Sequence, residues 1–291
     1  MKTGLVLEGG AMRGMYTAGV LDVLHREGVR FDGIMGVSAG ALFGPNFLSG
    51  QEGRVIRYNK RFIRDPRYKG LGCLLRTGDL FSRDFAYDIV PRELDVFDDA
   101  AFQASGVPFY AVVTNLDTGL PEYMQVKSVF DDMEILRASG SMPFVSKPVE
   151  LQGRRYLDGG VADSIPFAAM EAMGYEKQLV ILTRDMDYRK KPMPAGAIKL
   201  WYRHHPQFRD QLLRRHQVYN DSVARLKELE EQGKYFVIRP SRPIEIGRVE
   251  SDPDKLQAVY ELGLRDGQAA LAPLREYMGD KPFPLHQNSF T

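Results

Sequence analysis

The sequence contains one cysteine, Cys73, and no long run of apolar residues. A single thiol excludes an intramolecular disulfide and a zinc site made of several thiolates. A signal peptide needs a run of about 7–15 apolar residues and a membrane-spanning helix one of about 20, and no segment of the chain is that long. These absences predict a soluble protein of the cytoplasm, with Cys73 as a small buried side chain.

An excess of charge of either sign is also absent. The chain of 291 residues has 39 lysines and arginines against 38 aspartates and glutamates, a net charge of +1. Nucleic-acid-binding domains are usually basic and carry a recognisable motif, and neither applies here. Apolar residues make up 44% and charged residues 26%, which is ordinary for a globular protein with a sizeable core. No set of metal ligands with a known spacing occurs, so neither a metal nor a cofactor is expected.

Alternating predicted strands and helices at the start of the chain indicate an α/β fold. Strands are predicted at residues 3–8 and 30–38, and helices at 13–28 and 39–50. Two strand–helix pairs within about fifty residues predict βαβ units and a parallel sheet.

The remaining chain is predicted to hold both kinds of element. Residues 51–105 are expected to be mostly helical and polar, and a lid over a site would lie there. Further strands are predicted at 108–116, 121–126, 147–151, 154–160, 177–184 and 234–240, and helices at 131–141, 206–232 and 253–278. Turns at 117–119 and at Gln152–Gly153 predict two hairpins. A soft boundary is placed at 172–185, after which the chain either docks on the same core or folds alone.

The segment EGGAMRG, residues 8–14, lies between the first strand and the first helix. Gly9 and Gly10 allow the backbone to approach a ligand closely, and the N–H groups at the helix start point toward it. A tight turn without a ligand is the alternative. A dinucleotide site is not favoured, because Ala11 stands where that motif needs glycine and no clear acidic residue closes the second strand.

The segment GVSAG, residues 36–40, follows the second predicted strand and precedes a helix. This is the context of a nucleophile elbow, in which the small residues Gly36 and Gly40 permit a strained turn that presents the Ser38 hydroxyl. The alternative is a serine that is small enough to pack at this point. The helix start behind Ser38 would favour a developing negative charge.

The segment DGG follows a predicted hairpin strand. Asp158, with Gly159 and Gly160, is either a turn former or a carboxylate held for chemistry. A serine needs a base to accept its proton, and none of the five histidines has a motif around it. Ser38 also follows the second strand, earlier than in an α/β-hydrolase, so a Ser–His–Asp triad is not favoured.

These three segments, in this order, resemble the patatin-like phospholipases, which use a Ser–Asp dyad without histidine. Residues 137–160 also resemble the stretch that precedes the dyad aspartate in that family. The resemblance covers roughly residues 3–172 and implies an acyl hydrolase domain with a three-layer α/β/α fold and a mainly parallel central sheet. Residues 173–291 look like the mainly helical, mixed α/β C-terminal extension of a bacterial subgroup, and no role is implied for them.

By position, the resemblance implies Ser38 as the nucleophile and Asp158 as the proton acceptor. It also implies an oxyanion loop made of Gly9, Gly10, Ala11, Arg13 and Gly14. The family usually has a third glycine where this chain has Ala11, whose N–H still serves unless the position needs a positive φ. Arg13 is either close enough to stabilise negative charge or an exposed residue of the first helical turn. Asp158 suits its role only in a desolvated pocket that raises its proton affinity.

Two basic stretches bear on the substrate. Residues 54–69 and 184–216 are rich in lysine and arginine, and Trp201, Tyr202 and Phe208 interleave with the second. Such stretches suit an anionic membrane surface, and two solvated helical faces are the alternative. We therefore expect a lipid ester, a phospholipid or lysophospholipid, met at the inner face of the membrane. The alternatives are a carboxylesterase or thioesterase for soluble acyl substrates and a regulatory adaptor, and the oligomeric state stays open.

Overall fold

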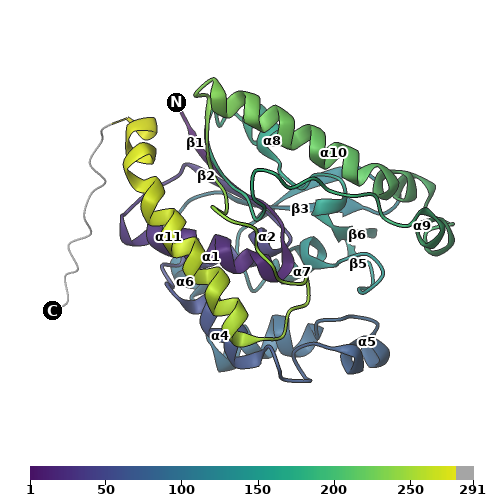
Figure 1. Cartoon of the computed structure of the whole chain (residues 1–291). Coiled ribbons are helices and arrows are strands. Elements are labelled where there is room, and N and C mark those ends of the chain that lie inside the picture. Colours follow the sequence, from purple (N-terminus) through teal and green to yellow (C-terminus); the bar gives the residue numbers. More distant parts are fainter. Residues whose placement is uncertain (280–291) are drawn as a thin grey trace.

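Within residues 1–279, the part of the chain that the computed structural model describes, five parallel strands form the centre of an eight-stranded sheet (Figure 1). The central order is β3 (Phe109–Asn115), β2 (Gly33–Val37), β1 (Thr3–Leu7), β7 (Lys177–Ile181) and β8 (Tyr235–Ile238). The other strands, β4 (Pro121–Val126), β5 (Val149–Leu151) and β6 (Arg154–Asp158), pair antiparallel. The prediction of a mainly parallel sheet is confirmed.

Helices cover both faces of the sheet. They are α1 (Gly14–Arg26), α2 (Ala39–Phe43), α3 (Pro45–Leu48), α4 (Arg54–Phe62), α5 (Leu71–Thr77), the π-helix η2 (Phe85–Leu94), α6 (Asp99–Ala104), α7 (Met133–Gly140), α8 (Phe167–Ala172), α9 (Ala195–Trp201), α10 (Pro206–Glu231) and α11 (Pro253–Met278), with short 3₁₀ turns η1 (Ala11–Arg13) and η3 (Gly159–Val161). Leu5 and Leu7 of β1 pack toward α1, α2 and α11, whereas Val6 packs toward α8 and α10 (Figure 1). The three-layer fold with a mainly helical C-terminal region is therefore confirmed.

Two predicted elements differ in detail. The helix expected at 39–50 is two short helices, because Pro45 has no N–H to donate and starts a new helix. The helix predicted at 131–141 is α7, and it has no side-chain cap, because the Asp132 carboxylate accepts hydrogen bonds from the backbone N–H groups of Lys127 and Ser128 instead. Both predicted hairpins are present, and Cys73 is buried. Of the five histidines considered as a base for Ser38, His286 lies outside the described residues.

The pairing of β3 brings the ends of β2 and β6 together. Val112 of β3 pairs with Val37, the last residue of β2, and the next residue, Val113, pairs with Asp158, the last residue of β6. Because β4 occupies the opposite edge of β3, β2 and β6 lie along the same edge. They run in opposite directions, so their C-terminal ends meet. This register places Ser38, the residue after β2, next to Asp158.

The C-terminal region shares the sheet and packs on the first helix. β7 pairs with β1, and β8 pairs with β7. Helix α11 crosses α1 (Figure 1) at two glycines that leave no room for a side chain. A Cβ on Gly19 would lie 2.2 Å from the Tyr260 carbonyl oxygen, and one on Gly263 would lie 2.1 Å from that of Tyr16. The two helices therefore touch backbone to backbone.

We predict that Gly263→Val lowers the free energy of unfolding by about 3 kcal/mol or more, because the helices must separate to admit the side chain. Urea denaturation followed by circular dichroism measures this loss. The control is Gly72→Ala in α5, where an added Cβ meets nothing within 4 Å. That variant should be as stable as wild type or slightly more so. Equal stability of the two variants would contradict the close crossing.

Candidate active site

Ser38 lies on a strained turn between β2 and α2. Its backbone has φ +53° and ψ −118°, a conformation that residues other than glycine rarely adopt. Such strain costs of the order of 1–3 kcal/mol and is common at functional sites. A Cβ on Gly36 would lie 2.6 Å from the backbone of Gly40, and one on Gly40 would lie 2.5 Å from the carbonyl oxygen of Leu7. The flanking glycines are thus required by the tight packing of this turn.

The Ser38 hydroxyl donates a hydrogen bond to the carboxylate of Asp158, with 2.8 Å between Oγ and Oδ2. The other carboxylate oxygen accepts from the backbone N–H of Gly160, also at 2.8 Å. Both side chains are buried, Ser38 at 7% and Asp158 at 5% exposure. A Cβ on Gly159 would lie 2.1 Å from the Val112 carbonyl oxygen, so this turn also needs its glycine. The structure therefore brings together two residues that are 120 positions apart.

Burial raises the pKa of Asp158 above its ordinary value of 3.8. The positive charge of Arg215 and the hydrogen bonds from Ser38 and Gly160 oppose this rise without cancelling it. The carboxylate therefore has a higher proton affinity than an exposed aspartate. That is the property a base needs in order to accept a proton from a hydroxyl.

The loop at Gly9, Gly10 and Ala11 lies beside Ser38 in the same cavity. Within the described part of the chain, none of the three backbone N–H groups donates a hydrogen bond. Ala11 has φ +48°, so this position does need a positive φ. The side chain therefore adds strain where glycine would not, although the N–H is present. Gly14 packs against α2, since a Cβ there would lie 2.8 Å from the Cβ of Ala39.

Arg13 is buried at 8% exposure, so the interpretation as an exposed first-turn residue is wrong. Burial, together with the nearby charge of Arg184, lowers the pKa of Arg13 to about 10. Its Nε is buried and has no hydrogen-bond partner within residues 1–279. The guanidinium lines the cavity that contains Ser38 and Asp158.

Sequence reasoning missed the residues that support the two loops. Glu8 is buried, and its carboxylate accepts hydrogen bonds from the Thr183 backbone at 2.5 Å and from the Tyr219 hydroxyl at 2.8 Å. Arg215 donates to the Gly160 carbonyl oxygen. Thr183 follows β7, and Tyr219 and Arg215 belong to α10. The C-terminal region therefore holds both the glycine loop and the Asp-Gly-Gly turn, and no local motif indicates this.

Two cavities meet at Ser38. The apolar cavity, of about 100 Å³, is lined mostly by apolar and aromatic side chains, including Met12, Leu42, Phe43, Tyr58, Val90 and Leu136. The basic cavity, of about 460 Å³, contains Asp158 and is lined by Arg13, Arg184, Lys190, Arg215 and Arg248. Ala11, Ser38 and Met142 line both. If the carbonyl of an ester lay at Ser38, one part of the ester would extend into the apolar cavity and the other part into the basic cavity.

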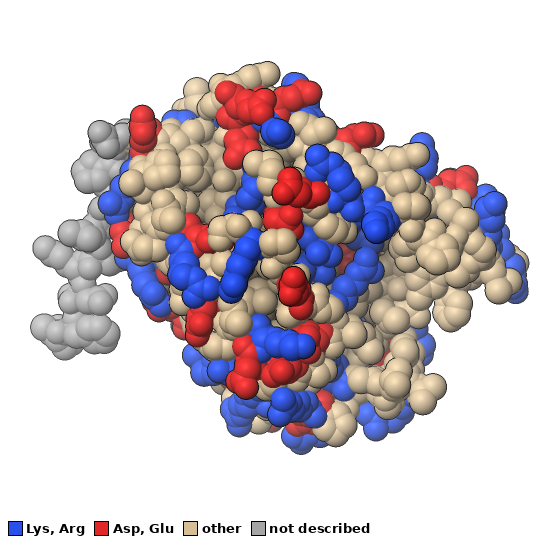
Figure 2. Space-filling view, viewed as in Figure 1, with Lys and Arg blue, Asp and Glu red and all other residues tan. Residues whose placement is uncertain are grey.

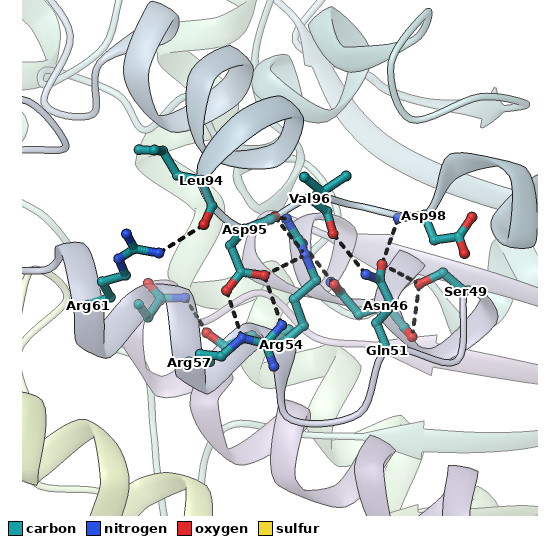
Figure 3. Close-up of polar contacts among 12 residues, drawn as sticks. Asn46, Ser49, Gln51, Arg54, Arg57, Arg61, Leu94, Asp95, Val96 and Asp98 are labelled. Atoms are coloured by element: carbon teal, nitrogen blue, oxygen red, sulfur yellow. Dashed lines mark hydrogen bonds and ion pairs between the residues drawn. The ribbon is translucent and has the colours of Figure 1, made fainter.

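Residues 51–105, expected to be polar and to be the place for a lid, supply much of the wall of the apolar cavity. A polar network around the buried side chains of Arg54 and Asp95 stabilises this wall (Figure 3). Asp95 receives two hydrogen bonds from Arg57, at 2.8 and 2.9 Å, and pairs with Arg54 at 3.2 Å. Arg54 also donates to Asn46 at 3.0 Å. The network ties α4 to the segment 94–98 and closes that side of the cavity with satisfied polar groups.

Within residues 1–279, no group of three or more His, Cys, Asp or Glu side chains is placed to hold a metal ion. Over the same residues, no helix combines the length and apolar character that a bilayer span requires.

We predict that Asp158→Asn is more stable than wild type at pH 7. Because the folded pKa of Asp158 lies above its unfolded value, the stability from this group is present at low pH and is lost as the pH rises through the folded pKa. The amide has no charge to desolvate and can still accept from Gly160 and contact Ser38. Urea denaturation at pH 7 and pH 4 should show a gain at pH 7 that shrinks at pH 4. Asp131→Asn, at an exposed position, is the control. If the difference in unfolding free energy between Asp158→Asn and wild type were the same at both pH values, the argument would be contradicted.

Ser38 thus lies on a strained turn between a strand and a helix, beside a buried carboxylate and at the junction with an apolar cavity, which is the local geometry of a nucleophile elbow. The sequence profile of the patatin-like phospholipase family matches residues 5–170, and that of a domain of unknown function, DUF6363, matches residues 205–279. The first match covers more than half of the chain, so the protein belongs to the patatin-like phospholipase family. It is a lipid ester hydrolase.

Relatives extend over different shares of the chain. It is 28% identical over 292 residues to the uncharacterized protein YjjU of Escherichia coli strain K12, covering 98% of this chain and 82% of that protein. It is 29% identical over 212 residues to the lysophospholipase NTE1 of Mycosarcoma maydis, covering 69% of this chain but 11% of that protein. Among solved structures, VipD from Legionella pneumophila aligns with a TM-score of 0.45 and 13% identity, over 94% of this chain and 67% of that one.

Proposed function

We propose that the protein cleaves carboxylic esters of lipids, a phospholipid or a lysophospholipid, with Ser38 as nucleophile and Asp158 as proton acceptor. The observation that carries this proposal is the 2.8 Å hydrogen bond between the two side chains in a buried site. Asp158 takes the proton as Ser38 attacks the ester carbonyl, and returns it to the departing alcohol. Water then attacks the acyl-enzyme in the same way and frees the fatty acid.

The free N–H groups of Gly9, Gly10 and Ala11 support a role as oxyanion donors. An oxyanion-hole donor is worth roughly 10²–10³ in rate, because it stabilises charge that develops only in the transition state. Ala11 keeps its N–H in the left-handed region, at a strain cost of the order of 1 kcal/mol. The loop is anchored by the Glu8 carboxylate one residue before it. The donors are therefore preorganised rather than assembled on binding.

The apolar cavity favours a lipid over a soluble acyl group. Its lining of aliphatic and aromatic side chains suits a hydrocarbon chain, which gains about 0.8 kcal/mol for each buried CH₂. The lysophospholipase relative from Mycosarcoma maydis agrees with this choice of substrate class. A carboxylesterase or thioesterase for short soluble substrates, and an adaptor that keeps the fold, stay as alternatives.

We predict that Ser38→Ala and Asp158→Asn each lose at least about 10³-fold in kcat/KM on a fluorogenic phospholipid, since both act in one catalytic unit. Ser222→Ala on α10 is the matched control, because its hydroxyl bonds only to the Val218 carbonyl oxygen. Hydrolysis of a short-chain chromogenic ester is measured in parallel. Cleavage of the short ester alone would favour the esterase. Activity that persists in Ser38→Ala would overturn the mechanism.

The proposal includes contact with a lipid surface. Exposed apolar side chains support this contact, rather than the two basic stretches. Tyr202 and Phe208 are buried, so two of the three interleaved aromatic residues do not face solvent. Instead, Leu71 and Leu75 on α5 and Leu200 and Trp201 on α9 are between 64% and 87% exposed. Leu71 lines the basic cavity, and the ring of Trp201 packs on Phe144, which lines it too. Leu71 and Trp201 therefore lie beside the basic cavity, and Leu75 and Leu200 are exposed on the same two helices.

We predict that Leu75→Ser combined with Trp201→Ser weakens binding to phosphatidylglycerol vesicles at least about tenfold, since burying each large apolar side chain is worth about 1.5–3 kcal/mol. Cosedimentation with vesicles measures the affinity. Met173→Ser, at an exposed position outside both cavities, is the control and should bind as wild type does. Equal binding by all three proteins would remove the membrane contact from the proposal.

A further inference from the structure

Five cationic side chains gather beside the candidate dyad. Arg13, Arg184, Lys190, Arg215 and Arg248 come from separate parts of the chain and line the basic cavity together with Ser38 and Asp158. On the face shown in Figure 2, lysine and arginine atoms lie interspersed with those of aspartate and glutamate. Arg248 belongs to the segment that joins β8 to α11. We call these five residues the basic cluster.

The positive charge of the basic cluster is not balanced by its surroundings. Within residues 1–279, none of the five side chains forms an ion pair with a carboxylate within 4.0 Å. The cavity is lined by two carboxylates, Glu8 and Asp158. Thr183 and Tyr219 occupy the oxygens of Glu8, and Ser38 and Gly160 occupy those of Asp158. The basic side chains that line this cavity therefore outnumber its carboxylates, five to two.

This surplus is unfavourable in the absence of an anion. Burial, and then the charges of Arg215, Arg248 and Arg13, lower the pKa of Lys190 well below its ordinary value. Burial also lowers the pKa of Arg215, and Arg13 Nε has no partner. Arg13 is buried and Arg184, Lys190 and Arg215 are half-buried, whereas Arg248 is exposed at the edge of the cavity. Cations that gather in one cavity without carboxylate partners indicate a site for an anionic ligand.

The position of the basic cluster indicates which part of a substrate it would contact. The apolar cavity and the basic cavity share Ser38, where the ester carbonyl must lie. With the acyl chain in the apolar cavity, the alcohol part of the ester extends into the basic cavity. Lysine and arginine arriving from several directions suit a phosphate group, which has several charged oxygens to share. A positively charged group on the same alcohol would be repelled by the surplus.

We propose that the basic cluster binds a phosphate group on the alcohol part of the lipid ester, and that the substrate is an acyl ester whose phosphate carries no compensating positive charge. This inference rests on the function proposed above. It gives a role to the region beyond residue 172, because four of the five cations lie there. Phosphate binding and acyl transfer would thus come from different parts of the chain.

The test compares two substrates with the same acyl chain, a lysophosphatidic acid and a neutral monoacylglycerol. Wild type should have a higher kcat/KM on the lysophosphatidic acid. Arg248→Gln and Lys190→Gln should each lower the ratio of the two kcat/KM values at least about tenfold, because a charge-assisted contact is lost. Arg215 is not used, since it also contacts the Asp-Gly-Gly turn. A ratio near one for wild type, or the same ratio in the variants, would overturn the inference.

Neighbouring cations provide matched controls. Arg242 lies on the same segment as Arg248, Lys191 follows Lys190, and both are exposed and outside the two cavities. Arg242→Gln and Lys191→Gln remove the same net charge and should keep the wild-type ratio. If they lower it as much as the cluster variants do, the effect is one of general charge and the site is refuted.

Binding experiments separate this inference from the proposed function. Isothermal titration of Ser38→Ala protein with the lysophosphatidic acid, and separately with inorganic phosphate, measures the cluster without any turnover. Binding that Arg248→Gln weakens at least about tenfold would support the cluster even if wild type hydrolysed nothing. Binding of lysophosphatidic acid but not of inorganic phosphate would identify the lipid headgroup as the ligand. Binding of neither would overturn the cluster even if the ester were cleaved.

Discussion

The hydrogen bond between Ser38 and the buried carboxylate of Asp158 is the constraint around which the rest of the site is arranged. Such a carboxylate is unfavourable in a dry interior, and here an Asp-Gly-Gly turn and the nearby charge of Arg215 keep it in place. The serine is equally restrained, on a left-handed backbone between two glycines that admit no side chain. Two unfavourable features therefore support each other, and the sheet register holds them in contact.

Charge is distributed unevenly around this pair. On one side of Ser38 the walls are aliphatic and aromatic, and the few polar groups there, such as Arg54 and Asp95, satisfy one another. On the other side the cations outnumber the carboxylates and remain unpaired. An amphiphile with an acyl chain at one end and an anion at the other matches this division of charge.

Much of this arrangement can be predicted from short segments. GVSAG between a strand and a helix indicates the elbow, and the two-residue turn at Gln152–Gly153 fixes the hairpin that ends at Asp158. The meeting of β2 and β6 could not be predicted, because it is set by which residues of β3 each one pairs with. Nor could Glu8, Tyr219 or Arg215 be singled out, since each acts on a partner more than fifty residues away. The positive φ of Ala11 likewise emerges only from the folded loop.

The hydrogen bond from the Tyr219 hydroxyl to the Glu8 carboxylate has a consequence for how such a chain can evolve. Removing everything after residue 172 would bare the edge of β1 that β7 covers and would leave a buried glutamate without its donors. The part that resembles other acyl hydrolases is therefore not a module that recombination can exchange freely. A new C-terminal partner would have to bring a hydroxyl for Glu8 and a cation for the Gly160 carbonyl, so the two parts are expected to be inherited together.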